Sequence, residues 1–128
     1  MDGIVYGVTV SLGFATYENY DYVFRWAEVW DIKPMQMAIW RSYSAVPFHG
    51  LAGCIMGFYF GKYAFTAEKK YLILSLLIPF IFHGLYNFLN YPYHFMILGV
   101  LTIYTVILHS NLKKLQGDKT QEKEIKKI

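Results

Sequence analysis

Four long runs of apolar residues leave few folds open to this chain. They cover residues 3–24, 44–65, 71–89 and 94–109. Each run is roughly 16–22 residues long, near the ~20 residues that a helix needs to cross a hydrocarbon core about 30 Å thick. The sequence therefore predicts an all-α fold, a polytopic transmembrane bundle of four helices. A buried soluble helical bundle is the alternative, and the lack of a polar face in the fourth run argues against it.

Lysines gather on one side of the predicted spans. Lys62, Lys69 and Lys70 bracket the turn between the second and third runs. A second cluster follows the fourth run and contains Lys113, Lys114, Lys119, Lys123, Lys126 and Lys127. Basic residues favour the cytoplasmic side, so we expect a multi-pass protein of the cell membrane with both termini in the cytoplasm. Residues 1–112 would form the membrane domain and residues 113–128 a basic cytoplasmic tail.

The position of these lysines also limits the choice of partner. The formal net charge of +3 comes largely from residues beside the predicted spans. Such residues face the lipid bilayer surface, so the charge does not indicate nucleic-acid binding. The connections at 26–43 and 91–93 would face the outer side. We interpret residues 26–43 as an outer loop, whose three tryptophans suit an interfacial belt and whose charges, Arg41 among them, make the basic bias imperfect.

Polar side chains interrupt the apolar runs at one common depth. Glu18, His49 and His83 each lie about five to seven residues from the outer end of a predicted span, which is ~8–10 Å at 1.5 Å per residue. An ionisable group at that depth is costly unless it faces a partner, a cavity or a metal. Asn87 follows His83 by four residues and so shares its helix face. The pattern predicts a buried polar site.

Glycines support this reading of the second run. Gly53, Gly57 and Gly61 follow His49 at four-residue spacing. Such a ladder lets a neighbouring helix approach closely, so we expect it at a helix contact. Taken singly, each polar residue has a plain structural reading, because a lone histidine can simply bridge two helices by a hydrogen bond. The combination at matched depth favours a functional site.

The residue types point to metal chemistry. Two imidazoles and one carboxylate form a known zinc ligand set, so Glu18, His49 and His83 are candidate metal ligands. A zinc ion with an open position lowers the pKa of bound water to about 7 and polarises a scissile carbonyl. Asn87 is a candidate hydrogen-bond donor to the oxyanion. A separate carboxylate normally serves as general base, and the nearest to this depth is Asp21, about one helical turn closer to the surface. If Glu18 binds metal, the base is therefore missing at this depth.

Three motifs in the chain resemble those of the PrsW family of intramembrane proteases, a part of the larger group that includes the CAAX-processing and bacteriocin-immunity proteases. The first motif is Asp2-Gly3-Ile4-Val5-Tyr6-Gly7 followed by Gly13-Phe14-Ala15-x-x-Glu18-Asn19. The second is Pro47-x-His49 before the glycine-rich run, and the third is His83-Gly84-Leu85-Tyr86-Asn87-Phe88. They occur in this order over about residues 2–90.

The resemblance implies a membrane-embedded, metal-dependent endopeptidase that cleaves a membrane-anchored protein near the outer face. The best-known members of the family cleave membrane-anchored anti-sigma factors. By resemblance, Glu18, His49 and His83 fall on catalytic or metal-binding positions and Asn87 on a supporting one. The family also carries a Glu-Glu-x-x-Lys motif upstream of its Asp-Gly segment, and these 128 residues do not contain it. We therefore expect part of a longer protease or a degenerate relative, with weak or no activity alone.

Two other functions compete with the protease. A non-catalytic membrane protein could keep the polar site for binding or helix packing, and the missing carboxylate pair favours that reading. A haem carrier could use His49 and His83 as axial ligands, but Glu18 and Asn87 would then lack a purpose.

Overall fold

The computed structural model describes residues 2–89 and 93–125, with helices and short connections and no strand in those ranges. The described elements are α1 (Asp2–Asp21), η1 (Tyr22–Trp26), α2 (Ala27–Val29), α3 (Pro34–Tyr43), α4 (Ala45–Thr66), α5 (Lys69–Phe88) and α6 (Tyr93–Ile125). The predicted all-α class is confirmed. Residues 90–92, most of the predicted outer turn, lie outside the described residues, as do the side chains of the tail from residue 113 onward.

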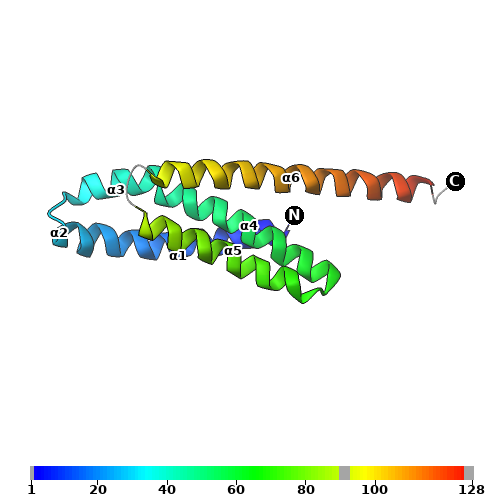
Figure 1. Ribbon diagram of the computed structural model, residues 1–128, viewed down its shortest axis with the longest axis horizontal. Coiled ribbons are helices and arrows are strands. Elements are labelled where there is room, and N and C mark those ends of the chain that lie inside the picture. Colours follow the sequence, from blue (N-terminus) through cyan, green and yellow to red (C-terminus); the bar gives the residue numbers. More distant parts are fainter. Residues whose placement is uncertain (1, 90–92, 126–128) are drawn as a thin grey trace.

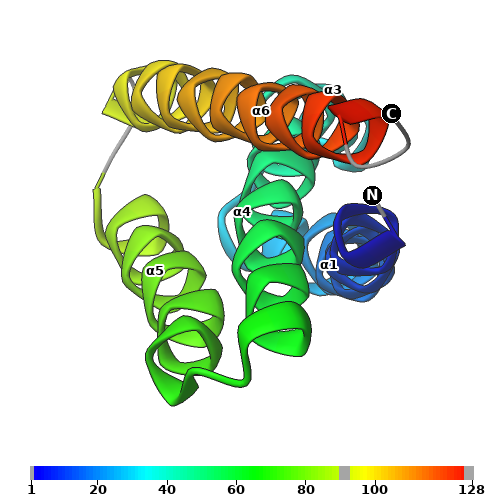
Figure 2. The same ribbon diagram turned by 90° about the vertical axis from the view of Figure 1, so that its right-hand side faces the viewer.

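α4 is the central helix, and α1, α3, α5 and α6 all contact it. Figure 1 shows α6 lying along the long axis of the molecule, with α3 at one end of the bundle. In Figure 2, α1 and α5 flank α4 on opposite sides while α6 crosses its third side. The buried apolar cluster lies where α4 meets α5 and α6, and consists of Ala45, Phe48, Ala52, Ile55, Phe58, Tyr86, Ile97, Leu101 and Leu108.

Glycines bring α1 and α4 together. A Cβ added at Gly7 would lie only 2.8 Å from Gly57 Cα, and one added at Gly53 would lie 2.8 Å from Ser11 Cβ. No side chain larger than hydrogen fits at these positions without a shift of one helix. Ser11 also donates a hydrogen bond of 2.7 Å to the backbone carbonyl of His49. The prediction that the glycine ladder permits a close helix approach is confirmed, and the approach fixes the polar end of α1 beside His49.

Two helices in the described residues are long and apolar enough to cross a membrane. They are α5 and the Tyr93–Leu112 part of α6. Large apolar side chains on both are exposed, for example Phe80 at 76% and Met96 at 66%, which suits contact with lipid. α1 and α4 do not pass the same test, because polar residues such as Glu18 and His49, with glycines and tyrosines, lower their hydropathy. Four spans therefore remain a prediction.

The interpretation of residues 26–43 as a loop is wrong. The chain leaves α1 through the π-helical turn η1 and the short α2, turns at Asp31 with a φ of 52°, and re-enters a helix at α3. Pro34 stands in the first turn of α3, where its missing N–H has no helical partner to lose. At the other end, α6 continues past residue 112 to Ile125, so the predicted tail begins inside a helix.

Candidate metal centre

Glu18, His49 and His83 meet at one point, although they come from three different helices. Glu18 Oε2 lies 3.2 Å from His49 Nε2, and Glu18 Oε1 lies 3.4 Å from His83 Nε2. One ligand-type atom from each residue lies within 4.8 Å of the other two. Ligands that share one zinc ion through bonds of about 2.0–2.2 Å stand roughly 3–4 Å apart. The donor set therefore fits a single divalent ion.

The surroundings of the two histidines agree with this fit. His49 is 3% exposed. His83 Nε2 is buried and has no hydrogen-bond partner among the described residues, since its contact with Glu18 lacks hydrogen-bond geometry. A buried polar atom without a partner is uncommon in folded proteins, and an unfilled ligand position is one explanation for it.

Two phenylalanine rings enclose the imidazoles. The Phe14 centroid lies 5.7 Å from that of His49 and 5.9 Å from that of His83. Phe48 lies 5.4 Å and 5.7 Å from the same two rings, and its side chain is fully buried. These rings limit the access of water and lower the local dielectric constant, which strengthens electrostatic interactions at the three polar groups.

Arg41 is the site residue that sequence reasoning missed. Its side chain, 9% exposed, donates a 2.5 Å hydrogen bond from Nη2 to Glu18 Oε2 and another of 2.5 Å from Nε to Asn19 Oδ1. Its guanidinium carbon also lies 3.8 Å from the centre of the Tyr22 ring. The only signal in the sequence was that Arg41 is a basic residue in a segment predicted to face the outer side, whereas basic residues favour the cytoplasmic side. The π-turn and α3 carry Arg41 back over the end of α1.

Of the two other polar residues singled out in the sequence, Asn87 lies beside a candidate ligand and Asp21 pairs with other side chains. The amide Nδ2 of Asn87 lies 3.4 Å from His83 Nδ1 on the same helix. Asp21, the nearest alternative carboxylate, accepts hydrogen bonds of 2.8 Å from Arg25 and 2.9 Å from Trp26. In residues 2–89 and 93–112, no carboxylate besides Glu18 joins the two histidines in a metal-type group.

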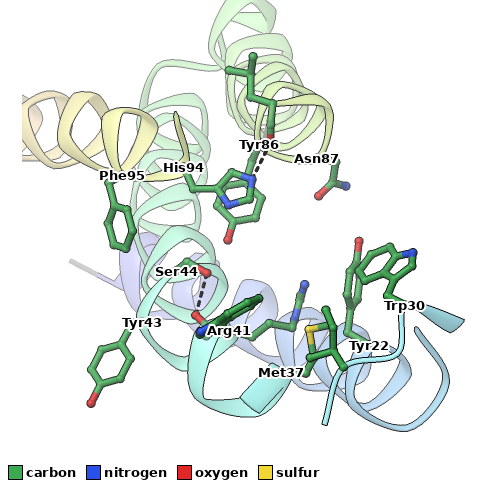
Figure 3. Close-up of a pocket in the computed structure, with 13 residues that line it drawn as sticks. Tyr22, Trp30, Met37, Arg41, Tyr43, Ser44, Tyr86, Asn87, His94 and Phe95 are labelled. Atoms are coloured by element: carbon green, nitrogen blue, oxygen red, sulfur yellow. Dashed lines mark hydrogen bonds between the residues drawn. The ribbon is translucent and has the colours of Figure 1, made fainter. Parts of the chain in front are cut away.

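A cavity of about 930 Å³ lies next to residues that contact the three ligands. Figure 3 shows its lining side chains, which come from η1 and the turn after α2, from α3, from α5 and from the start of α6. Its described lining consists of Tyr22, Trp30, Ile32, Met37, Trp40, Arg41, Tyr43, Ser44, Tyr86, Asn87, Leu89, His94 and Phe95. Two of these residues, Arg41 and Asn87, also contact Glu18 and His83. Arg41 and Asn87 therefore stand between the cavity and the candidate metal centre, and both spaces share these two side chains.

Comparison with known proteins agrees with the motifs. The family model described as PrsW family intramembrane metalloprotease matches residues 1–110. A protease PrsW from Clostridioides difficile (strain 630) is 36% identical over 131 residues, which cover 98% of this chain and 53% of that protein. A protease PrsW from Bacillus subtilis (strain 168) is 46% identical over 91 residues, which cover 69% of this chain and 38% of the relative.

A third relative, the protease PrsW of Geobacillus kaustophilus (strain HTA426), is 46% identical over 90 residues, covering 69% of this chain and 37% of its own length. The chain thus spans about half or less of the length of these curated relatives. No solved structure matches the chain.

Proposed function

Because the chain belongs to the PrsW family of intramembrane metalloproteases, we propose that it forms the metal-binding part of a membrane-embedded endopeptidase. The observation that carries the proposal is the meeting of Glu18, His49 and His83 within 4.8 Å. Zinc is the divalent ion that this ligand set suits best. A bound ion would supply Lewis-acid activation of a water molecule and of the scissile carbonyl.

The residues of this chain would divide the remaining work. The guanidinium of Arg41 holds Glu18 in one orientation and offsets its negative charge. A carboxylate has two oxygens, so Glu18 can keep this partner and still bind a metal. Asn87 lies beside His83 with an amide donor, and we assign it the role of stabilising the carbonyl oxygen as charge develops on it.

The substrate would be a membrane-anchored protein, and an anti-sigma factor fits the family resemblance. The site lies near one end of the bundle, where α3 packs against η1 and α4 and Arg41 reaches the end of α1. With α5 and α6 across the lipid bilayer and both termini in the cytoplasm of a multi-pass membrane protein, this end faces the outer side. Cleavage would then occur near the outer face of the membrane.

The lack of a separate carboxylate to act as general base favours a second candidate function. Glu18 is the only carboxylate in the metal-type group of the described residues, and it cannot easily be both ligand and base. Positioned acid–base catalysis contributes about 10²–10⁴ in rate. We therefore expect the 128-residue chain alone to cleave weakly or not at all, and the alternative is a non-catalytic membrane protein that retains the polar site.

Reconstituted proteolysis tests the proposal. The chain, and a version extended at its N-terminus by the matching segment of a curated relative, are purified in detergent with zinc and given membrane-anchored substrates. Cleavage by the extended version that stops with a chelator and with His83→Ala supports the proposal. His109→Ala, outside the three-residue group, is the matched control and retains cleavage. Cleavage that survives both the chelator and His83→Ala would remove the metal from the mechanism, and no cleavage of any substrate favours the non-catalytic function.

A further inference from the structure

We propose that the 930 Å³ cavity beside the metal centre binds an extended segment of the polypeptide substrate and accepts a large uncharged apolar side chain near the scissile bond. The inference rests on the proposed protease function and adds to it a substrate class and a place of binding. The volume of the cavity lies near the top of the ~300–1,000 Å³ range typical of ligand sites. It therefore offers room for more than one residue of a peptide.

Contacts connect the cavity to the candidate catalytic residues. Arg41 forms part of the wall and donates to Glu18, and Asn87 forms another part and lies 3.4 Å from His83. The Tyr86 ring, also in the wall, stacks on Phe48 with centroids 4.6 Å apart, and Phe48 packs against both imidazoles. A chain segment lying in the cavity would thus contact side chains that themselves contact the two histidines or Glu18.

The lining distinguishes a peptide from a lipid chain. Rings and aliphatic groups alternate with hydrogen-bonding groups, as the view in Figure 3 of Ser44, Asn87 and the tyrosine hydroxyls shows. An extended peptide has backbone N–H and C=O groups that can form hydrogen bonds with these groups of the wall. An acyl chain would instead cover the polar groups of the wall and leave them without hydrogen-bond partners. The wall is partly fixed, because His94 Nε2 donates a hydrogen bond of 2.7 Å to the Leu89 carbonyl oxygen and the His94 ring stacks on Tyr86 with centroids 4.2 Å apart.

Charge in the lining selects against ionised side chains. Among the described lining residues there is no carboxylate, so a lysine or arginine of the substrate would find no counter-ion. Arg41 is the one described lining residue with a permanent charge, and Glu18 already pairs with it. An aspartate or glutamate would have to compete with that pair. Tryptophan, tyrosine and methionine side chains of the wall suit a large apolar group instead.

Photo-crosslinking tests the inference without requiring cleavage. The probe is a synthetic leucine/alanine transmembrane helix preceded by an uncharged outer segment that carries p-benzoylphenylalanine at one position. It is bound to the 128-residue chain in detergent with a chelator, and the crosslinked residues are located by mass spectrometry. We expect crosslinks to the cavity wall, at Met37, Trp40 or Phe95, and competition by a matching segment with leucine but not with glutamate at the probe position.

A matched pair of variants checks the assignment. Trp40→Ala removes an aromatic ring from the wall and should lower the crosslink yield roughly tenfold. The reason is that the probe loses one aromatic contact and the apolar surface that this contact buries. Trp26→Ala, which alters a tryptophan outside the lining, should leave the yield unchanged. Crosslinks on the outer faces of α5 or α6, or equal competition by glutamate, would overturn the inference. Crosslinks in the cavity without cleavage by the extended protein would instead overturn the protease proposal alone.

Discussion

Arg41 Nη2 lies 2.5 Å from Glu18 Oε2, so a cation from the segment between two long helices pairs with the central carboxylate of the candidate metal centre. Both side chains are largely buried, at 9% and 15% exposure. The same guanidinium donates to Asn19 and lies over the Tyr22 ring. Arg41 therefore links α3 to the end of α1 and holds the orientation of Glu18.

Removal of the Arg41 side-chain charge should destabilise the fold. Arg41→Met leaves Glu18 without its strongest partner in a buried place, and breaking a buried pair in this way costs about 3–5 kcal/mol. The double variant with Glu18→Gln should recover part of that loss, giving a coupling energy of at least ~1 kcal/mol in a double-mutant cycle. Denaturant unfolding in detergent measures these free energies.

Arg25 provides the control for that cycle. It forms an ion pair of 2.8 Å with Asp21, but its side chain is 76% exposed. Exposed pairs contribute about 0–1 kcal/mol, so Arg25→Met should have little effect on unfolding. Equal effects of Arg25→Met and Arg41→Met would contradict the role that we give to burial.

Zinc should bind to the purified chain through Glu18, His49 and His83. Competition against a fluorescent chelator measures the affinity directly and does not depend on proteolysis. Even outer contacts of a metal site are worth about 10–100-fold in affinity, so His83→Ala or His49→Ala should weaken binding by at least roughly 100-fold. His94→Ala serves as the comparison, since His94 contacts the Leu89 carbonyl rather than the three ligands. Unchanged affinity in His83→Ala would exclude the proposed ligand set.

The glycine contact between α1 and α4 should be sensitive to a single methyl group. A Cβ at Gly7 would lie 2.8 Å from Gly57 Cα, so Gly7→Ala must separate the helices and should cost about 1–3 kcal/mol, the usual range for overpacking. Gly13 stands in the same helix with nothing within 4 Å of an added Cβ. Gly13→Ala should be neutral or stabilise by up to ~1 kcal/mol through helix propensity. Thermal unfolding of both variants in detergent separates the two effects, and an equal response would refute the contact.

Membrane topology can be read from cysteine accessibility. Cys54 is the only native cysteine and would first be replaced by alanine. We expect Met35→Cys to react with an impermeant thiol reagent added to intact cells, because α3 lies on the predicted outer side. Gln116→Cys should react only after the membrane is permeabilised, as lysines near it favour the cytoplasm. Reaction of position 116 from outside would invert or reject the four-span topology.

The family motifs and the helical class were readable along the chain because each depends on neighbours in sequence. Long apolar runs predict helices whatever they pack against, and the all-helical fold confirms this. Residues 26–43 were wrongly predicted to be a loop because that prediction relied on long apolar runs, and this segment has none. α3 has no long apolar run, and its helix is set by Pro34 at its start and by packing of Met37 and Arg41 against the bundle.

By itself, the sequence determined the membership in a protease family through its motifs. It also indicated the three residues that gather at the centre, because a carboxylate and two histidines at membrane depth are costly unless they share a site. Only the tertiary structure decided what surrounds them. Glu18 and Arg41 stand 23 residues apart and meet because the π-turn and α3 fold the chain back over α1. The cavity likewise forms where η1, the turn after α2, α3, α5 and α6 meet, since a concave surface depends on how helices are placed in space and on no local pattern of residues.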